Sequence, residues 1–280
     1  MGKSRGGISI ARFGKIANLK WANFSEIVEA KAMSKPEFND WNPPPKRREL
    51  SANEVHVWRA KLHRSAREIE QFRAMLSPDE KGRSRRFYFD RDRHDFIVGR
   101  GILRSILSGY LNIKAEKIAF EYRDRGKPGL ANPGDRAIEF NVSHSNGLAL
   151  YAVTRDRPIG IDVEYLRPLR HAEQLANRFF TPPEVAAIAA LAPEEKQTAF
   201  FHAWTRKEAY LKATGEGLAG LEAVEVSVSP EMPAKLLRIR GDRQLASCWF
   251  LCDIHPHPAY LAALAIEGEG HLCYYSWEHE

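Results

Sequence analysis

The sequence predicts an α+β fold, and three observations support that prediction. Helix-like and strand-like patterns are mixed along the 280 residues without the regular strand–helix–strand alternation of a parallel α/β sheet. Each half of the chain carries one long helical stretch followed by strands, which is compatible with a duplicated architecture. Hydrophobic residues make up 44% of the chain and charged residues 28%, so the composition is that of a globular protein rather than a disordered or fibrous one.

Residues 1–50 are expected to form a disordered basic extension outside the core. They contain ten Lys or Arg against five Asp or Glu, which leaves residues 51–280 nearly neutral. Three prolines at 43–45 followed by the charged run 46–48 are typical of a linker. A docking or targeting arm is the alternative for this segment. Because the body is nearly neutral, a generally basic nucleic-acid-binding protein is not favoured.

The folded body is expected to begin at 55–58, which alternates like a strand. A helix over 64–75 follows. The next helix has Ser77 as its N-cap, proline at its first position and Glu80 at its third, which is the pattern of a capping box. A longer helix spans about 92–111, where apolar residues recur at helical spacing.

Positive charge is concentrated in one part of the body. Segment 81–104 holds eight basic and three acidic residues, which suits one bound anionic ligand better than a generally basic surface. Arg100 and Arg104 lie one helical turn apart and would project side by side. Asn146-Gly147 is a strong hairpin signal between two predicted strands. The later predicted elements are strands over 138–142, 148–153, 159–164, 224–228, 235–240, 246–253 and 260–266, and helices over 175–179, 183–191 and 194–213.

The sequence carries neither a membrane-spanning run nor a disulfide pattern. No apolar run reaches the ~20 residues that cross a bilayer, and the basic N-terminus lacks the apolar core of a secretory signal. The three cysteines, Cys248, Cys252 and Cys273, include no Cys-x-x-Cys pair, so a reducing cytoplasm is expected. We expect the first two to be buried core thiols rather than zinc ligands with His255 and His257.

Segment 159–164 carries the first candidate site. On a strand, Ile159, Ile161 and Val163 would enter the core, and Asp162 and Glu164 would share the opposite face, ~6.5 Å apart. Two carboxylates this close repel each other, and a divalent cation such as Mg²⁺ or Mn²⁺ removes the repulsion. An exposed edge strand with ordinary surface acids is the alternative.

Trp204, Glu208 and Lys212 form the second candidate, because they follow one another four residues apart in one row along a helix. Two interpretations are open. Glu208 and Lys212 are an ordinary surface salt bridge, or Glu208 is a further metal ligand or base and Lys212 meets an anionic group.

Two shorter segments complete the set of candidates. In 141–145, Ser143 and His144 could hydrogen-bond a phosphate, or the segment could be an ordinary hydrogen-bonded turn. Gly126-Lys127-Pro128 offers a close backbone approach and a point charge, but it does not fit the P-loop pattern. The sequence has no Gly-x-Ser-x-Gly signature of a serine hydrolase.

Taken in order, these segments resemble the Sfp-type 4′-phosphopantetheinyl transferases. Segment 160–164 is similar to the family's G-[IV]-D-[VI]-E signature, and 204–212 is similar to W-x-x-K-E-x-x-x-K. Segment 141–145 resembles N-[IV]-S-H-S, and 126–128 resembles G-K-P. The resemblance covers about residues 55–266, and four motifs in the correct order make it specific.

The resemblance implies a fold and a reaction. The fold is two similar α/β halves related by a pseudo-twofold, here 51–158, which would bind the coenzyme A phosphates, and 159–280, which would hold the metal and the catalytic residues. The reaction is transfer of 4′-phosphopantetheine from coenzyme A to a serine of an apo acyl or peptidyl carrier protein, with release of 3′,5′-ADP. Fatty-acid, polyketide and non-ribosomal-peptide synthesis are all open as the pathway.

The resemblance also implies residue roles. Asp162, Glu164 and Glu208 would hold Mg²⁺, or Mn²⁺ in its place; Glu208 would also act as the base, and Lys212 would stabilise the transferring phosphate. The residues expected to contact coenzyme A are Lys81, Arg83, Arg86, Lys127, Pro128, Ser143, His144 and Lys212. One departure is Glu80, where the family often has lysine.

We expect a monomer that works in the cytoplasm with neither nucleic acid nor membrane as a partner. Two alternatives in function remain open. The same acids could serve another divalent-metal phosphotransferase or a pyrophosphate hydrolase, or the chain could be a non-catalytic module that binds carrier proteins.

Overall fold

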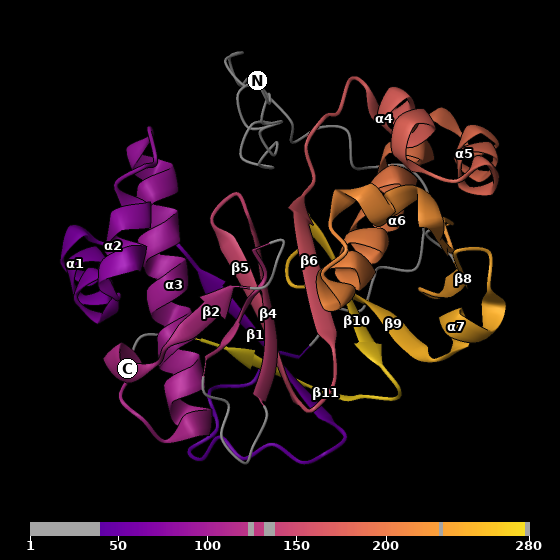
Figure 1. The fold of residues 1–280 in the computed structure, drawn as a ribbon. Coiled ribbons are helices and arrows are strands. Elements are labelled where there is room, and N and C mark those ends of the chain that lie inside the picture. The colour runs from indigo at the N-terminus through magenta and orange to yellow at the C-terminus, as the bar shows by residue number, and fades with distance from the viewer. Residues whose placement is uncertain (1–39, 123–125, 132–137, 230–231, 278–280) are drawn as a thin grey trace, which may run out of the picture. The chain divides into compact units, whose positions relative to one another are not determined.

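The computed structural model describes residues 40–122, 126–131, 138–229 and 232–277, and every element below lies in that part of the chain (Figure 1). Most of the predicted extension, residues 1–39, lies outside the described residues, as does part of the predicted loop at 123–125. No helix in the described part is long and apolar enough to cross a bilayer.

The two halves of the fold repeat one order of elements. The first half runs β1 (Glu54–Lys61), α1 (Ala66–Met75), α2 (Pro78–Ser84), α3 (Asp90–Leu111), β2 (Phe120–Tyr122), β3 (Pro128–Leu130), β4 (Ile138–Ser145) and β5 (Leu148–Arg155). The second half runs β6 (Ile159–Tyr165), α4 (Ala172–Phe179), α5 (Pro182–Ala189), α6 (Pro193–Thr214), β7 (Val224–Val226), β8 (Leu236–Ile239), α7 (Arg243–Ser247), β9 (Trp249–Ile254) and β10 (Tyr260–Glu267), before β11 (His271–Ser276) closes it. Each half thus contains a strand, three helices, a small hairpin and an antiparallel pair, and the second half adds the short helix α7 between its hairpin and its pair. The third helix has 22 residues in both.

The sheets repeat the same pairing as well. The larger sheet has the order β11-β1-β5-β4 and the smaller one the order β6-β10-β9. In each half the first strand pairs antiparallel with the last strand of the closing pair, β1 with β5 and β6 with β10. Strand β11 has no counterpart in the first half, and it adds in parallel to β1. The predicted α+β fold with two similar halves is therefore confirmed.

The two sheets lie face to face between two layers of helices. Alternate residues of β5, from Leu148 to Ala152, enter an apolar core that also receives Ile161 of β6 and Leu264 of β10. The intervening residues of β5, such as Tyr151, pack instead with α1 and α3. In the second half α6 covers the outer face of β10, and Figure 1 shows it lying across β6 and β10. Both faces of each sheet are covered, which explains the nearly continuous apolar run of β5.

A buried ion pair at the same place in each half joins the second helix to the third. Glu80 closes the predicted capping box of α2 and bonds the guanidinium of Arg104 at 2.8 Å. Glu184 closes the capping box of α5 and bonds the ammonium of Lys207 at 2.5 Å. Both cations are the fifteenth residue of their helix. Glu80 is thus occupied with fixing α2 to α3, where both Arg104 and Arg100 contact it.

Residues 40–50, which we expected to lie in the extension, pack on the body. Asn42 forms a bridge to β11, donating to the Tyr274 carbonyl at 3.0 Å. Arg59 stacks over the Trp41 ring at 4.8 Å, and Arg48 donates to the Ser105 carbonyl at 2.5 Å. The folded body therefore begins before residue 51, and the boundary predicted from the proline and charge run was placed too late.

Two other expectations need correction. The predicted strand 246–253 is broken by α7, so Cys248 caps that helix and is exposed rather than buried. Cys252 lies on β9 and packs against the core between the sheets. Strand β11 was not predicted, and the loop 123–129 contains the start of β3.

Candidate active site

Strand β6 sends its side chains alternately to two sides. Residues from Ile159 to Val163 with odd numbers enter the core between the sheets, as predicted. Gly160, Asp162 and Glu164 have the opposite parity and face α6. Only 4% of Asp162 is exposed, so β6 is not an exposed strand with ordinary surface acids.

Gly160 allows α6 to approach this strand closely. A Cβ at this position would lie 2.0 Å from the carbonyl oxygen of Ala209 and 2.4 Å from the amide nitrogen of Ala213. Such distances are far below van der Waals contact, so only glycine fits without moving the helix. The first residue of the motif therefore sets how near Glu208 and Lys212 of α6 lie to the acids of β6.

Lys212 pairs with the strand rather than with its helical neighbour. Its Nζ donates to Asp162 Oδ1 at 2.6 Å and to Ser143 Oγ at 2.9 Å, and the Ser143 hydroxyl donates to the same carboxylate oxygen at 2.9 Å. Burial acts to lower the pKa of Lys212, but the surrounding carboxylates, chiefly Asp162 and then Glu208, outweigh it and raise the pKa. The ammonium is therefore a fixed positive charge inside the site.

The segment 141–145 joins the two sheets through side chains. Asn141 Oδ1, Ser143 Oγ and Ser145 Oγ accept hydrogen bonds from three successive outward amides of β6, at 3.0, 3.3 and 3.1 Å. These amides belong to residues 161, 163 and 165, so side chains of β4 satisfy this edge of β6 without backbone hydrogen bonds between the two strands. The polar alternation of β4 thereby fixes β6, and with it the acids, against the first half of the fold.

Glu164 and Glu208 are ionised less readily than ordinary carboxylates. Burial, with the negative charge of Asp162 second, raises the pKa of each to about 7. Ser145 donates to Glu164 at 3.2 Å, which partly compensates for its burial. The three acids share one low-dielectric environment in which like charges repel.

The residues of this site fit a divalent cation. Asp162 Oδ2 and Glu208 Oε1 are both buried, and neither has a hydrogen-bond partner among the residues that the structure describes. Unpaired buried carboxylate oxygens are costly, and a cation would satisfy them. Carboxylates are hard oxygen ligands, which suit Mg²⁺ or Mn²⁺. Among the described residues, the acid, histidine and cysteine side chains that gather as a compact group are Glu54, His56 and Cys273, not these three carboxylates.

Lys127 lies at the join of β6 and α6. Its Nζ donates to the carbonyl oxygens of Ile159 at 3.1 Å and Ala213 at 2.8 Å. The ammonium thus meets the C-terminal end of α6, where a positive charge is favourable. Pro128 follows it as the first residue of β3, and both residues are half-buried.

The predicted basic residues of α2 lie in the first half of the fold. Arg83 and the following Arg86 are exposed, and Lys81 is half-buried with its Nζ 3.4 Å from the Ala74 carbonyl. Their described contacts stay within that half, and among the described residues none joins them to the acids of β6. A cavity of about 500 Å³ between α1, α2 and α3 has four basic side chains in its lining: Arg73, Arg85, Arg93 and His94. His144 of β4 is exposed, on the face opposite Ser143.

The sequence analysis did not predict the buried ion pairs on the other face of α6. Arg206 is fully buried and bonds both carboxylate oxygens of Asp253, at 2.9 and 2.6 Å. Its neighbour Lys207 binds Glu184 and the Val224 carbonyl. Two basic residues inside a mostly apolar helical pattern were the available signal, since buried cations need partners. Trp204 stacks on Phe200 and lies half-buried among aromatic rings.

Comparisons with known families match each half of the chain to a 4′-phosphopantetheinyl transferase family. Residues 158–265 match the 4′-phosphopantetheinyl transferase superfamily, and residues 60–155 match the 4′-phosphopantetheinyl transferase N-terminal family. The 4′-phosphopantetheinyl transferase HetI of a Nostoc species is 47% identical over 234 residues, which cover 82% of this chain and 94% of that protein.

Two less similar relatives align with about half of this chain. The 4′-phosphopantetheinyl transferase Sfp of Bacillus subtilis is 33% identical over 155 residues, 55% of this chain and 67% of that protein. The L-aminoadipate-semialdehyde dehydrogenase-phosphopantetheinyl transferase of Xenopus laevis is 31% identical over 165 residues, 55% of each chain.

Proposed function

This chain belongs to the 4′-phosphopantetheinyl transferase superfamily, and we propose that Asp162, Glu164, Glu208 and Lys212 carry out its reaction. The enzyme transfers 4′-phosphopantetheine from coenzyme A to a serine of a carrier protein. The serine oxygen forms a bond to the β-phosphorus of coenzyme A, and the bond from that phosphorus to the bridging oxygen breaks. The bridging oxygen leaves on 3′,5′-ADP, and the serine proton passes to a base.

The observation that carries the assignment is the pair of unpartnered buried oxygens beside a fixed ammonium. Within the described part of the chain Asp162 Oδ2 and Glu208 Oε1 have no hydrogen-bond partner, and Lys212 binds the other oxygen of Asp162. Asp162, Glu164 and Glu208 would hold Mg²⁺ or Mn²⁺. When bound, the metal neutralises charge on the pyrophosphate as the phosphoryl group is transferred.

The protein residues act on the proton and on the phosphate charge. We assign Glu208 as the base because burial raises the pKa of its carboxyl to about 7, so that the carboxylate is a stronger proton acceptor than that of an ordinary glutamate. Lys212 stabilises negative charge on the transferring or leaving phosphate, in a site that excludes most water. Ser143 holds both Lys212 and Asp162 in position for this.

The first half would bind the rest of coenzyme A. Lys81 and Arg83 of α2, with Arg86 just after its end, would supply positive charge where the 3′-phosphate is expected. His144, from the exposed face of β4, and Pro128 are further candidate contacts. Lys127 already binds two carbonyls, so we assign it first to holding α6 against β6.

The partners follow from the same reasoning. Coenzyme A and an apo acyl or peptidyl carrier protein are the substrates. We expect a cytoplasmic monomer with no nucleic-acid or membrane partner, because the body carries almost no net charge and one chain supplies both halves of the fold.

The test is to incubate the full-length chain with coenzyme A, Mg²⁺ and an apo carrier protein and to weigh the carrier by intact-mass spectrometry. The carrier should gain one phosphopantetheine. Glu208→Gln should reduce turnover by at least ~100-fold at saturating coenzyme A, within the range of general-base assistance. Glu194→Gln makes the same change at an exposed position of the same helix and should leave turnover unchanged.

The assay also separates the alternatives. A pyrophosphate hydrolase would release 3′,5′-ADP without any gain in carrier mass. A carrier-binding module would do neither. If Glu208→Gln keeps more than half of the parental turnover, the assignment of the site to α6 and β6 is wrong even where the carrier gains mass.

A further inference from the structure

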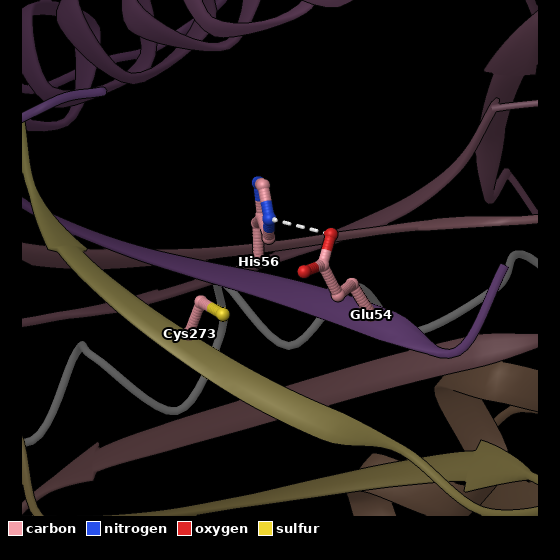
Figure 2. A group of neighbouring side chains, drawn as sticks. All are labelled: Glu54, His56 and Cys273. Carbon is pink, nitrogen blue, oxygen red and sulfur yellow. Dashed lines mark ion pairs between the residues drawn. The ribbon is translucent and has the colours of Figure 1, made fainter. Parts of the chain in front are cut away.

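A second group of metal-ligating side chains lies on the larger sheet, where β11 adds to β1. Glu54, His56 and Cys273 bring one ligand atom each to within 4.8 Å of one another (Figure 2). The Glu54 carboxylate lies 3.7 Å from His56 Nε2. Figure 2 shows the three side chains projecting from the same side of the two neighbouring strands.

The register of the strands explains why these residues meet. In the parallel pair, Glu54 lies opposite His271 and His56 lies opposite Cys273. Paired residues of parallel strands project to one face, and residues two apart on a strand share that face. The four side chains therefore form a two-by-two grid. His271 is exposed, and its charge adds to the hydrogen bond from the Ser51 amide that is the main cause of the lowered pKa of Glu54.

The spacing is close to that of a bound transition-metal ion. Ligands held ~2.0–2.3 Å from a tetrahedral zinc ion lie about 3.3–3.8 Å from each other, and the separation of 3.7 Å between Glu54 and His56 already satisfies this. A thiolate with an imidazole and one carboxylate favours zinc over magnesium or calcium.

The imidazole is also oriented from behind, as metal-binding histidines usually are. His56 is 3% exposed, and its Nδ1 lies 2.7 Å from the Tyr110 hydroxyl of α3. The same hydroxyl accepts a hydrogen bond from Trp58 Nε1 at 3.0 Å. With its proton on Nδ1 and donated to the Tyr110 oxygen, the imidazole would present an unprotonated Nε2 on the side of Glu54.

We propose that Glu54, His56 and Cys273 bind one zinc-type divalent cation, with His271 or water as the fourth ligand. Binding forms a metal–sulfur bond and releases the Cys273 thiol proton to solvent. Glu54 Oε2, the oxygen 3.7 Å from His56 Nε2, also accepts a hydrogen bond from the Ser51 amide at 2.9 Å, and a carboxylate oxygen has a second lone pair for the metal. The ion fastens the last strand of the chain to the first strand of the sheet.

This site is separate from the candidate active site. The acids of β6 lie on the face of the smaller sheet toward α6, whereas His56 lies on the face of the larger sheet toward α3. The active-site acids also include no sulfur ligand. Spectroscopy that detects a metal–sulfur bond therefore distinguishes the two sites.

The experiment uses the full-length protein after treatment with a chelator, titrated with Co²⁺ as a probe. A thiolate-to-cobalt charge-transfer band should appear, saturate at one equivalent and vanish when Zn²⁺ is added. Cys273→Ser should abolish the band. Cys248→Ser, which changes an exposed thiol elsewhere, should keep it.

Thermal unfolding gives an independent measurement. Zn²⁺ should raise the melting temperature of the parent and of Cys248→Ser more than that of Cys273→Ser or Glu54→Gln, in which only the active-site acids can still bind the metal. Circular dichroism without metal shows whether each variant is folded. Absence of the charge-transfer band in the folded parent, its retention in Cys273→Ser, or an equal zinc-dependent rise in that variant would each overturn the proposal.

Discussion

Replacing Gly160 with alanine would place a methyl group inside the contact between β6 and α6. The new Cβ would lie 2.0 Å from the Ala209 carbonyl oxygen, while a relaxed carbon–oxygen contact is ~3.3 Å. The helix must therefore move by about 1.3 Å. A shift of that size would stretch the hydrogen bond of 2.6 Å between Lys212 and Asp162 to as much as about 3.9 Å, beyond hydrogen-bond range.

Both stability and turnover should respond to this change. Overpacking of this kind costs ~1–3 kcal/mol, which lowers the melting temperature of a protein this size by several degrees. Misplacing catalytic groups by ~1 Å can reduce turnover ~100-fold. The carrier mass assay and a thermal melt measure the two effects.

Gly82→Ala is the matched control. A Cβ at Gly82 meets nothing within 4 Å, and alanine favours the helix in which this residue lies. That variant should keep its activity and its melting temperature or gain a little stability. Parental activity and stability in Gly160→Ala would refute the argument that glycine sets the position of α6.

Three further predictions concern stability. Lys207→Met leaves a buried carboxylate unpaired and should lower the free energy of unfolding in urea by ~3–5 kcal/mol. Lys196→Met breaks a more exposed pair and should lower it by less than ~1 kcal/mol. Equal losses of unfolding free energy in the two variants would contradict this prediction. Burial, with a neighbouring carboxylate second, raises the pKa of Glu208 from 4.5 to about 7, so the folded state binds more protons than the unfolded state between these values. The unfolding free energy of the metal-free protein should therefore fall as pH rises from about 5 to about 7, and Glu208→Gln should flatten that dependence; an unchanged slope would rule out its part. Trp41→Ala removes ring contacts with β1 and β11 and should lower the free energy of unfolding by ~1–2 kcal/mol. Tyr88 is 86% exposed, so Tyr88→Ala should leave that free energy almost unchanged. An unchanged unfolding free energy in Trp41→Ala would mean that residues 40–50 add no stability.

Local patterns predicted most of the helices and strands. The capping box at Ser77 and Glu80 is formed as predicted, because a cap depends on neighbours within one turn. The alternation around Asp162 correctly placed the acids on one face of a strand. The helical row of Glu208 and Lys212 is also formed, since it depends only on the period of the helix.

Contacts between distant segments could not be predicted in the same way. Strand β11 pairs with a strand more than 200 residues earlier, so nothing near 271–276 in the sequence indicates its partner. The partners of Lys127 are main-chain carbonyls, which any residue could supply. The side chains of Asn141 and Ser143 accept hydrogen bonds from backbone amides of β6. A short alternation of polar residues in the sequence does not distinguish that role from phosphate binding.

The two halves share one arrangement of elements, but the residues at matching positions of their long helices, α3 and α6, differ. Counting along the 22-residue helices, Glu208 and Lys212 of α6 correspond to Ser105 and Gly109 of α3. Arg48 lies against Gly109, where a Cβ would come within 2.3 Å of its side chain. The place held in one half by the proposed catalytic residues is thus filled in the other by Arg48, which packs against the helix. Each chain would consequently turn over a single coenzyme A at a time. Placing an acid at Ser105 and a lysine at Gly109 would not create a second reaction centre unless Arg48 were also removed.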